Sequence, residues 1–127
     1  GMTGGQMAPT TMPDQITTTS PAGRNVAEVG FPIRMAELLS ALVTPAYIER
    51  VSVHAPEYII QAKQAIRRAF TYQVEGTCFS LVEVLSTCPT NWGMTPTDAT
   101  AWLRENLMPY YPLGVHKTPE RSVLGGA

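Results

Sequence analysis

The feature that most constrains the fold is a strand–helix–strand pattern in the middle of the chain. Residues 47–53 are rich in β-branched side chains and predict a strand. A proline that suits a first helical turn, followed by apolar residues at helical spacing, predicts a helix over about 56–72. Residues 77–86 are apolar at both alternating positions apart from Glu83, which predicts a strand covered on both faces. The two strands should therefore be parallel and joined by a right-handed crossover.

The middle helix has two contrasting sides. Its apolar stripe should pack into the core and consists of Ile59, Ala62, Ile66, Ala69 and Phe70. Its basic residues lie off this stripe and are Lys63, Arg67 and Arg68. We interpret them as a solvated face and not as a nucleic-acid patch. The formal net charge of −1 supports this interpretation, because nucleic-acid binding relies on excess positive charge.

Two further helices flank this pattern. Apolar residues at three- to four-residue spacing predict a short helix over 35–42. A later helix should begin after Thr95, which can cap it, with Asp98 in the acidic position of a capping box. Pro109 should end this helix.

The domain organisation follows from these elements. We expect residues 1–34 to be a loop segment, 35–109 to be an α/β domain and 110–127 to be a tail. Two strands are few for a stable sheet, and charged residues make up only 15% of the chain. The chain should therefore be the end of a larger α/β domain or associate with a partner. No apolar run approaches the roughly 18 residues of a membrane span, and two cysteines make no disulfide framework, so a reducing cytoplasm is the expected location.

The opening stretch, GMTGGQMAPTTMPDQITTTSPAGR, is rich in Gly, Thr, Pro and Met. Three interpretations of its MTGGQ part are open. It nearly reproduces an epitope tag but lacks one Gln. It can be a plain flexible loop. Alternatively, its consecutive glycines let the backbone approach a phosphate, with Thr3 offering a hydroxyl and amides.

Four motifs in order carry a resemblance to a known family. They are MTGGQMAPTT, TTTSPAGR, GFPIR and FSLVEVLSTCPTNWGMTP. With these motifs, residues 1 to about 117 resemble the thiamine-diphosphate-binding β subunit of 2-oxoacid:ferredoxin oxidoreductases, in the group that acts on 2-oxoglutarate or branched-chain 2-oxoacids. The resemblance implies the C-terminal part of an open, mostly parallel sheet of the thiamine-diphosphate-binding fold, with a βαβ unit and flanking helices.

The resemblance also implies cofactor contacts. Thr3, Gly4, Gly5 and Gln6 should lie beside the diphosphate and the thiazolium of thiamine diphosphate. In the family, Mg²⁺ and the diphosphate are held by a GDG motif and by an Asn-rich stretch ahead of these residues, and this chain contains neither. We therefore expect the chain to be a fragment of the cofactor-binding subunit, with weak affinity for the cofactor when alone.

Cys88 is the candidate metal ligand. It follows the end of the second predicted strand, where sites in open α/β sheets tend to lie. In members of the resembled family that carry a [4Fe–4S] cluster on this subunit, a cysteine at this position is the fourth ligand. The alternative is a buried structural thiol, and one thiolate alone cannot hold a cluster. Cys78 lies within the strand and should belong to the core.

The remaining candidates have weaker signals. His54 should mark the entry of a helix, and His54 and His116 are too far apart for a convincing metal or triad site. Arg24 and Arg34 flank the long loop, where they could meet a substrate carboxylate or the phosphates of coenzyme A, with surface salt bridges as the alternative. Trp92 should pack in a loop or at an interface.

These observations predict a fragment of an enzyme subunit. By resemblance, the complete enzyme oxidatively decarboxylates a 2-oxoacid, forms an acyl-coenzyme A and passes electrons to ferredoxin. Its partners would be the other subunits of a homo- or hetero-oligomeric complex, with no nucleic acid and no membrane, and this chain alone should be inactive. The alternative hypothesis is a stand-alone, non-catalytic interaction or assembly module that lacks the half that binds Mg²⁺ and diphosphate.

Overall fold

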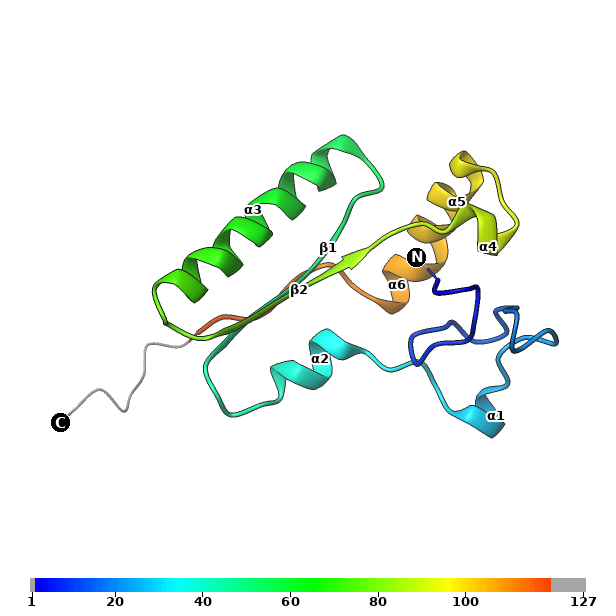
Figure 1. Ribbon diagram of the computed structural model, residues 1–127, viewed down its shortest axis with the longest axis horizontal. Helices are drawn as coiled ribbons and strands as arrows, with labels where there is room; N and C mark the ends of the chain where they lie inside the picture. The colour runs from blue at the N-terminus through cyan, green and yellow to red at the C-terminus, as the bar shows by residue number, and fades with distance from the viewer. Residues whose placement is uncertain (1, 120–127) are drawn as a thin grey trace. The chain divides into compact units, whose positions relative to one another are not determined.

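The computed structural model describes residues 2–119, which fall into two compact units. Among the described residues, the sheet unit comprises residues 35–85 and 111–119. The loop-helical unit comprises residues 2–34 and 86–110. Figure 1 shows the helices and strands of both units.

The sheet unit contains a three-stranded mixed sheet in the order β2-β1-β3. Strands β1 (Ala46–Ser52) and β2 (Phe79–Leu85) are parallel, with Ala46 opposite Phe79 and Ser52 opposite Leu85, as predicted (Figure 1). Strand β3 (Gly114–Lys117) pairs with β1 in the antiparallel direction. The expected open α/β sheet is therefore present, but among the described residues it is a mixed sheet with one parallel and one antiparallel pairing. The third strand lies in the range expected to be a tail, and its pairing satisfies the backbone groups on the second side of β1.

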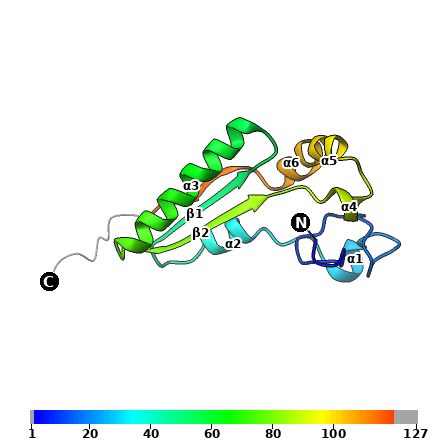
Figure 2. The same cartoon turned by 45° about the horizontal axis from the view of Figure 1, so that its top comes forward.

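Strand β1 is the centre of this unit, and all seven of its residues are buried. Successive side chains of a strand point to opposite faces of the sheet. One core cluster, on the side of helix α2 (Met35–Ser40), consists of Ala36, Ala46 and Ile48. The other, on the side of helix α3 (Pro56–Val74), consists of Val51, Ala62 and Ala65. The two helices thus cover opposite faces of the sheet (Figure 2).

Strand β2 is less covered than its sequence predicts. Leu85 is its only buried residue, and Phe79 is 49% exposed. The expectation of a strand covered on both faces is wrong, because β2 is an edge strand and the short helix α2 lies against β1 and β3. The apolar run therefore identifies the strand correctly but not its burial.

Helix α3 begins at Pro56 as predicted and ends before Gly76, whose φ of +63° suits glycine. Its buried residues are Ala62 and Ala65. The prediction that the wider apolar stripe forms core is wrong for its large members. Ile59 is 39% exposed, Ile66 is 41% exposed and Phe70 is 67% exposed. The helix meets the sheet through its small residues, so the large apolar side chains face away.

The loop-helical unit is built mainly from turns and short helices. They are α1 (Val26–Val29), α4 (Pro89–Trp92), α5 (Pro96–Trp102), the π-helical segment η1 (Leu103–Leu107) and α6 (Met108–Tyr110). The cap predicted for α5 is confirmed, since the Thr95 hydroxyl accepts from the Asp98 N–H at 3.2 Å. No helix among residues 2–119 is long and apolar enough to cross a membrane.

The last helical run does not end at Pro109, where the sequence predicts its end. It continues to Tyr110 through a π-helical turn, in which the Met108 N–H bonds to the Leu103 carbonyl. A proline ring in an α-helix collides with the carbonyl four residues earlier. The wider π turn lies directly before Pro109, where it eases that collision.

Candidate cofactor-binding site

Residues 3–6 form a tight turn with two consecutive glycines in the left-handed region. Gly4 has φ of +59° and Gly5 has φ of +68°, and the Gln6 N–H donates to the Thr3 carbonyl at 3.2 Å. Residues with side chains rarely adopt these angles. Gly5 is buried, whereas the other three residues are exposed. The two-glycine turn is therefore packed against the protein at Gly5 and open to solvent at its other three residues.

The amides of this turn are its chemically important groups. Within residues 2–119, the N–H groups of Thr3, Gly4 and Gly5 have no hydrogen-bond acceptor. Successive backbone N–H groups in a turn of this kind form a concave site for an anion. The Thr3 side chain is exposed beside them and carries one more hydroxyl donor.

The carbonyl side of the turn is held by Thr18. Its N–H donates to the Gly5 carbonyl at 2.8 Å, and its hydroxyl donates to the Gly4 carbonyl at 3.2 Å. A Cβ atom added to Gly5 would lie 3.0 Å from the Thr18 methyl group and 2.9 Å from the Asn91 side-chain oxygen. Glycine is thus required at position 5 by both the backbone angle and the space.

Cys88 lies in the same unit as the two-glycine turn and is joined to it. Its sulfur accepts hydrogen bonds from the Met2 N–H and from the Asn91 side-chain amide, each at 3.3 Å. The hydrogen bond from the Met2 amide, with a smaller contribution from Asn91, outweighs partial burial and lowers the pKa of the Cys88 thiol. The thiol is half-buried and takes part in no disulfide. The structure therefore brings the predicted cofactor residues and the predicted metal ligand together.

Arg24 is placed differently from its prediction. Its side chain is buried and donates to four backbone carbonyls of its own unit, those of Ala8, Pro9, Thr11 and Gly30, at 2.9–3.2 Å. Both suggested roles, in an anion site and in a surface salt bridge, are therefore wrong for this arginine. It organises the long loop from inside.

Four other candidates contact the protein around them. Arg34 lies over the Tyr110 ring at 4.4 Å, and Trp92 contacts the Trp102 ring at 4.8 Å, which agrees with loop packing. The His54 ring nitrogen is 2.8 Å from the Ser52 hydroxyl, just before α3 begins. Cys78 is only partly buried, so its assignment to the core is wrong in degree, and burial raises the pKa of its thiol.

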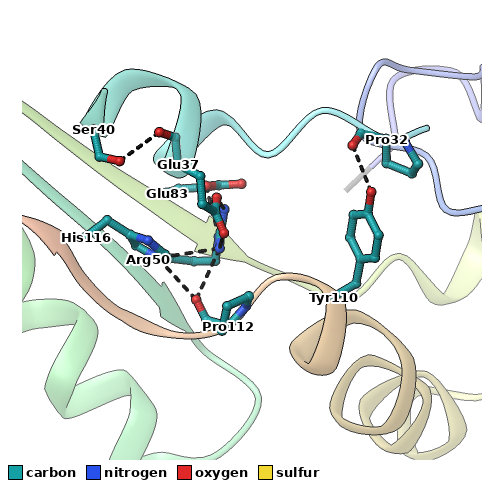
Figure 3. Close-up of polar contacts among 8 residues, drawn as sticks. All are labelled: Pro32, Glu37, Ser40, Arg50, Glu83, Tyr110, Pro112 and His116. Carbon is teal, nitrogen blue, oxygen red and sulfur yellow. Dashed lines mark hydrogen bonds and ion pairs between the residues drawn. The ribbon is translucent and has the colours of Figure 1, made fainter. Parts of the chain in front are cut away.

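A second polar cluster, in the sheet unit, surrounds Arg50 (Figure 3). This side chain is fully buried and forms two hydrogen bonds to the Glu37 carboxylate, at 2.9 Å and 2.5 Å. Its Nε donates to Glu83 at 3.0 Å, and its Nη1 also donates to the Pro112 carbonyl at 3.1 Å. The hydrogen bond from Arg50 lowers the pKa of Glu37 to about 2. Each of the three guanidinium nitrogens donates to a protein acceptor, so we assign this cluster to the fold and not to ligand binding.

The sequence indicated four of the turn residues and Cys88 but missed the two side chains that hold them. Thr18 is one of three consecutive threonines, and nothing in that run distinguishes it. Asn91 lies three residues after Cys88, within α4, and this spacing is the signal that could have identified it. Among residues 2–119, no group of three or more metal-binding side chains occurs.

Comparisons with known proteins identify relatives for most of the chain. The ketoisovalerate oxidoreductase subunit VorA of Methanothermobacter thermautotrophicus is 45% identical over 113 residues, which is 89% of this chain and 24% of that subunit. The 2-oxoglutarate synthase subunit KorB of Archaeoglobus fulgidus is 38% identical over 84% of this chain and 35% of that subunit. The KorB subunit of Methanocaldococcus jannaschii is 33% identical over 84% of this chain and 37% of that subunit.

These relatives are considerably longer than the segment they share with the chain, which spans between 24% and 37% of their length. No family model and no solved structure matches the chain. The names of the relatives specify two different 2-oxoacids, ketoisovalerate and 2-oxoglutarate. The chain is therefore homologous to one segment of the subunits of enzymes that act on 2-oxoacids.

Proposed function

We propose that this chain is the C-terminal part of the thiamine-diphosphate-binding subunit of a 2-oxoacid:ferredoxin oxidoreductase. Its homology to VorA and KorB subunits supports the enzyme class. The observation that carries the cofactor assignment is the two-glycine turn near Cys88, three of whose amides have no acceptor among residues 2–119. In this proposal Thr3, Gly4, Gly5 and Gln6 contact the cofactor.

The residues of the turn fit the diphosphate end of the cofactor. Successive N–H groups and the Thr3 hydroxyl supply hydrogen-bond donors, and the glycines let phosphate oxygens approach the backbone closely. Gln6 is exposed at the end of the turn and carries both a donor and an acceptor. When bound, thiamine diphosphate supplies the nucleophilic carbon and the electron sink for decarboxylation of a 2-oxoacid. The Mg²⁺ ligands would come from sequence outside this chain.

Cys88 fits a role as one ligand of an iron–sulfur cluster in the complete enzyme. Two N–H groups already point at its sulfur, and hydrogen bonds of this kind stabilise a thiolate and tune a cluster. The other ligands would come from elsewhere in the complex. Coenzyme A, ferredoxin and the other subunits belong to the same proposal.

The proposal is tested by a chimera. This chain replaces the aligned segment of the VorA subunit within the complete ketoisovalerate oxidoreductase of M. thermautotrophicus. Calorimetry should show Mg²⁺-dependent binding of thiamine diphosphate. Gly5→Ala should weaken it about tenfold or more, which corresponds to about 1.4 kcal/mol, because the added methyl group meets Asn91 and Thr18.

The matched control is Gly30→Ala. Gly30 also has a positive φ, of +77°, and lies in the same unit, but a Cβ there meets nothing within 4 Å. Both substitutions place Ala at a positive φ, and only Gly5→Ala brings the added Cβ against Thr18 and Asn91. An assembled chimera that binds no cofactor, or that binds it equally with Ala at position 5, would refute the proposed contact.

A second function, as an interaction module, is supported by the exposed face of α3. Its large apolar side chains, at positions 59, 66 and 70, are between 39% and 67% exposed. Exposed apolar patches in soluble proteins mark surfaces for association. If this function alone applies, the chimera would assemble with its partner subunits without binding thiamine diphosphate.

A further inference from the structure

The Asn91 side chain makes three contacts, which connect the two-glycine turn with Cys88. Its side-chain N–H groups donate to the Met2 carbonyl and to the Cys88 sulfur, each at 3.3 Å. Its oxygen lies 2.9 Å from the place that a Cβ of residue 5 would occupy, and so borders Gly5 directly. One amide group thus joins segments that are 89 positions apart in the sequence.

The hydrogen bonds around the turn are divided by type. Asn91 donates a hydrogen bond to the carbonyl of Met2, and Thr18 donates to the carbonyls of Gly4 and Gly5. These three carbonyls therefore accept hydrogen bonds from within the protein. Its amides, from residue 3 to residue 5, are left without acceptors among the described residues. Because the carbonyls are bonded within the protein, the amides of residues 3–5 are the groups of the turn that can bind a ligand.

We propose that Asn91 is a positioning residue for the diphosphate contact, and this inference rests on the function proposed above. Its side chain fixes the two-glycine turn against Cys88 in the conformation that leaves the amides of residues 3–5 without an acceptor in the described part of the chain. Only an amide supplies two N–H donors and one oxygen at this reach. An ionised carboxylate of the same shape has no donor for the Met2 carbonyl or for the sulfur.

The positioning role is tested first without any ligand, by amide hydrogen exchange in this chain. The Met2 N–H bonds to the Cys88 sulfur, and the Thr18 N–H bonds to the Gly5 carbonyl, so both amides report on the turn. Asn91→Ala and the isosteric Asn91→Asp should each speed their exchange about tenfold. Asn106→Ala is the matched control, because Asn106 lies in the same unit and its amide bonds only to the Trp102 carbonyl among residues 2–119.

The isosteric variant separates hydrogen bonding from space filling. If Asn91 only fills space, Asn91→Asp should exchange like the wild type, and the proposed role would be wrong. If its donors position the turn, the Asp and Ala variants should behave alike while the thermal midpoint stays equal to that of Asn106→Ala.

The second test is binding of inorganic diphosphate, followed by the NMR shifts of the Gly4 and Gly5 amides. Asn91→Ala should weaken binding about five- to tenfold, because the turn loses the hydrogen bonds from Asn91 that hold its amides in the binding conformation, and one such bond has about this effect. Equal affinity in the wild type and in Asn91→Ala would overturn the inference and leave the proposed function standing. If the wild type shows no binding, the proposed diphosphate contact is refuted, and the exchange rates alone decide whether Asn91 holds the turn.

Discussion

The Glu37–Arg50 pair allows a quantitative prediction about stability and pH. We expect Glu37→Gln to lower the free energy of unfolding of the sheet unit at pH 7. The pair is bidentate and its arginine is fully buried (Figure 3). Lowering the pKa of Glu37 from 4.5 to about 2 corresponds to about 3.4 kcal/mol, at 1.36 kcal/mol per pKa unit. The Glu37 side chain is 32% exposed, and solvent screening reduces this to about 2 kcal/mol.

The pH dependence has a definite sign. The pKa of Glu37 is lower in the folded protein than in the unfolded chain, so the unfolded chain binds the proton first. The contribution is therefore complete above about pH 4.5 and is lost as the pH falls toward 2. The wild type should lose about 2 kcal/mol more than Glu37→Gln over this range.

Urea unfolding followed by far-UV circular dichroism at a series of pH values measures both quantities. Glu57→Gln is the control, because Glu57 is exposed in the first turn of α3 and should change stability by less than about 0.5 kcal/mol. A difference between wild type and Glu37→Gln that stays constant from pH 7 to pH 2 would refute the reasoning. So would a difference at pH 7 no larger than that of the control.

Three further predictions concern other parts of the chain. Arg24→Met should destabilise the loop-helical unit by about 2–3 kcal/mol, since four carbonyls lose a buried charged donor, whereas the exposed Arg104→Met should have little effect in the same unfolding experiment. Thr95→Ala should cost about 1 kcal/mol by removing the cap of α5, and Thr97→Ala, which alters an exposed side chain in the same turn, should not. The chain should self-associate through exposed apolar surface, and Phe70→Ser should reduce the association seen by sedimentation velocity without lowering the thermal midpoint.

The parts of the fold that sequence predicted well depend on neighbours along the chain. The parallel pair β1–β2, the start of α3 at Pro56 and the Thr95 cap all follow from local periodicity or from a single turn. The two-glycine turn was singled out through the resemblance to a known family, because its consecutive glycines alone left three interpretations open.

The parts that sequence missed depend on contacts between distant segments. The strand β3 is only four residues long and becomes a strand by pairing with β1. Arginine is usually found on protein surfaces. Arg24 is buried because the folded loop places four carbonyls around its side chain. Asn91 likewise gains its role from Met2, which lies 89 positions earlier in the sequence. Patterns in short stretches of sequence do not reveal such long-range pairs.

The side of α3 that faces the sheet carries an arginine of an ion pair and does not carry the large apolar residues of the helix. Glu49 and Arg50 are adjacent in the central strand, so their side chains point to opposite faces and each needs a counter-charge from a different layer. Arg50 finds Glu37 on α2, and Glu49 finds Arg68 on α3 at 2.8 Å. Arg68 also donates to the Tyr47 hydroxyl at 2.9 Å.

Arg68 shares one helix face with the residues that touch the sheet. Positions 62, 65, 68 and 72 follow one another at helical spacing, and Ala62 and Ala65 are buried while the Tyr72 ring lies 5.2 Å from that of Tyr47. Once Arg68 is directed at the sheet, the large apolar residues at 59, 66 and 70 must turn away from it. The Arg68 side chain is 47% exposed, as predicted, but its guanidinium bonds to the sheet, so the sequence misjudged both its direction and the position of the apolar stripe. A charged pair in a strand flanked by helices is the sequence signal that would have corrected both assignments.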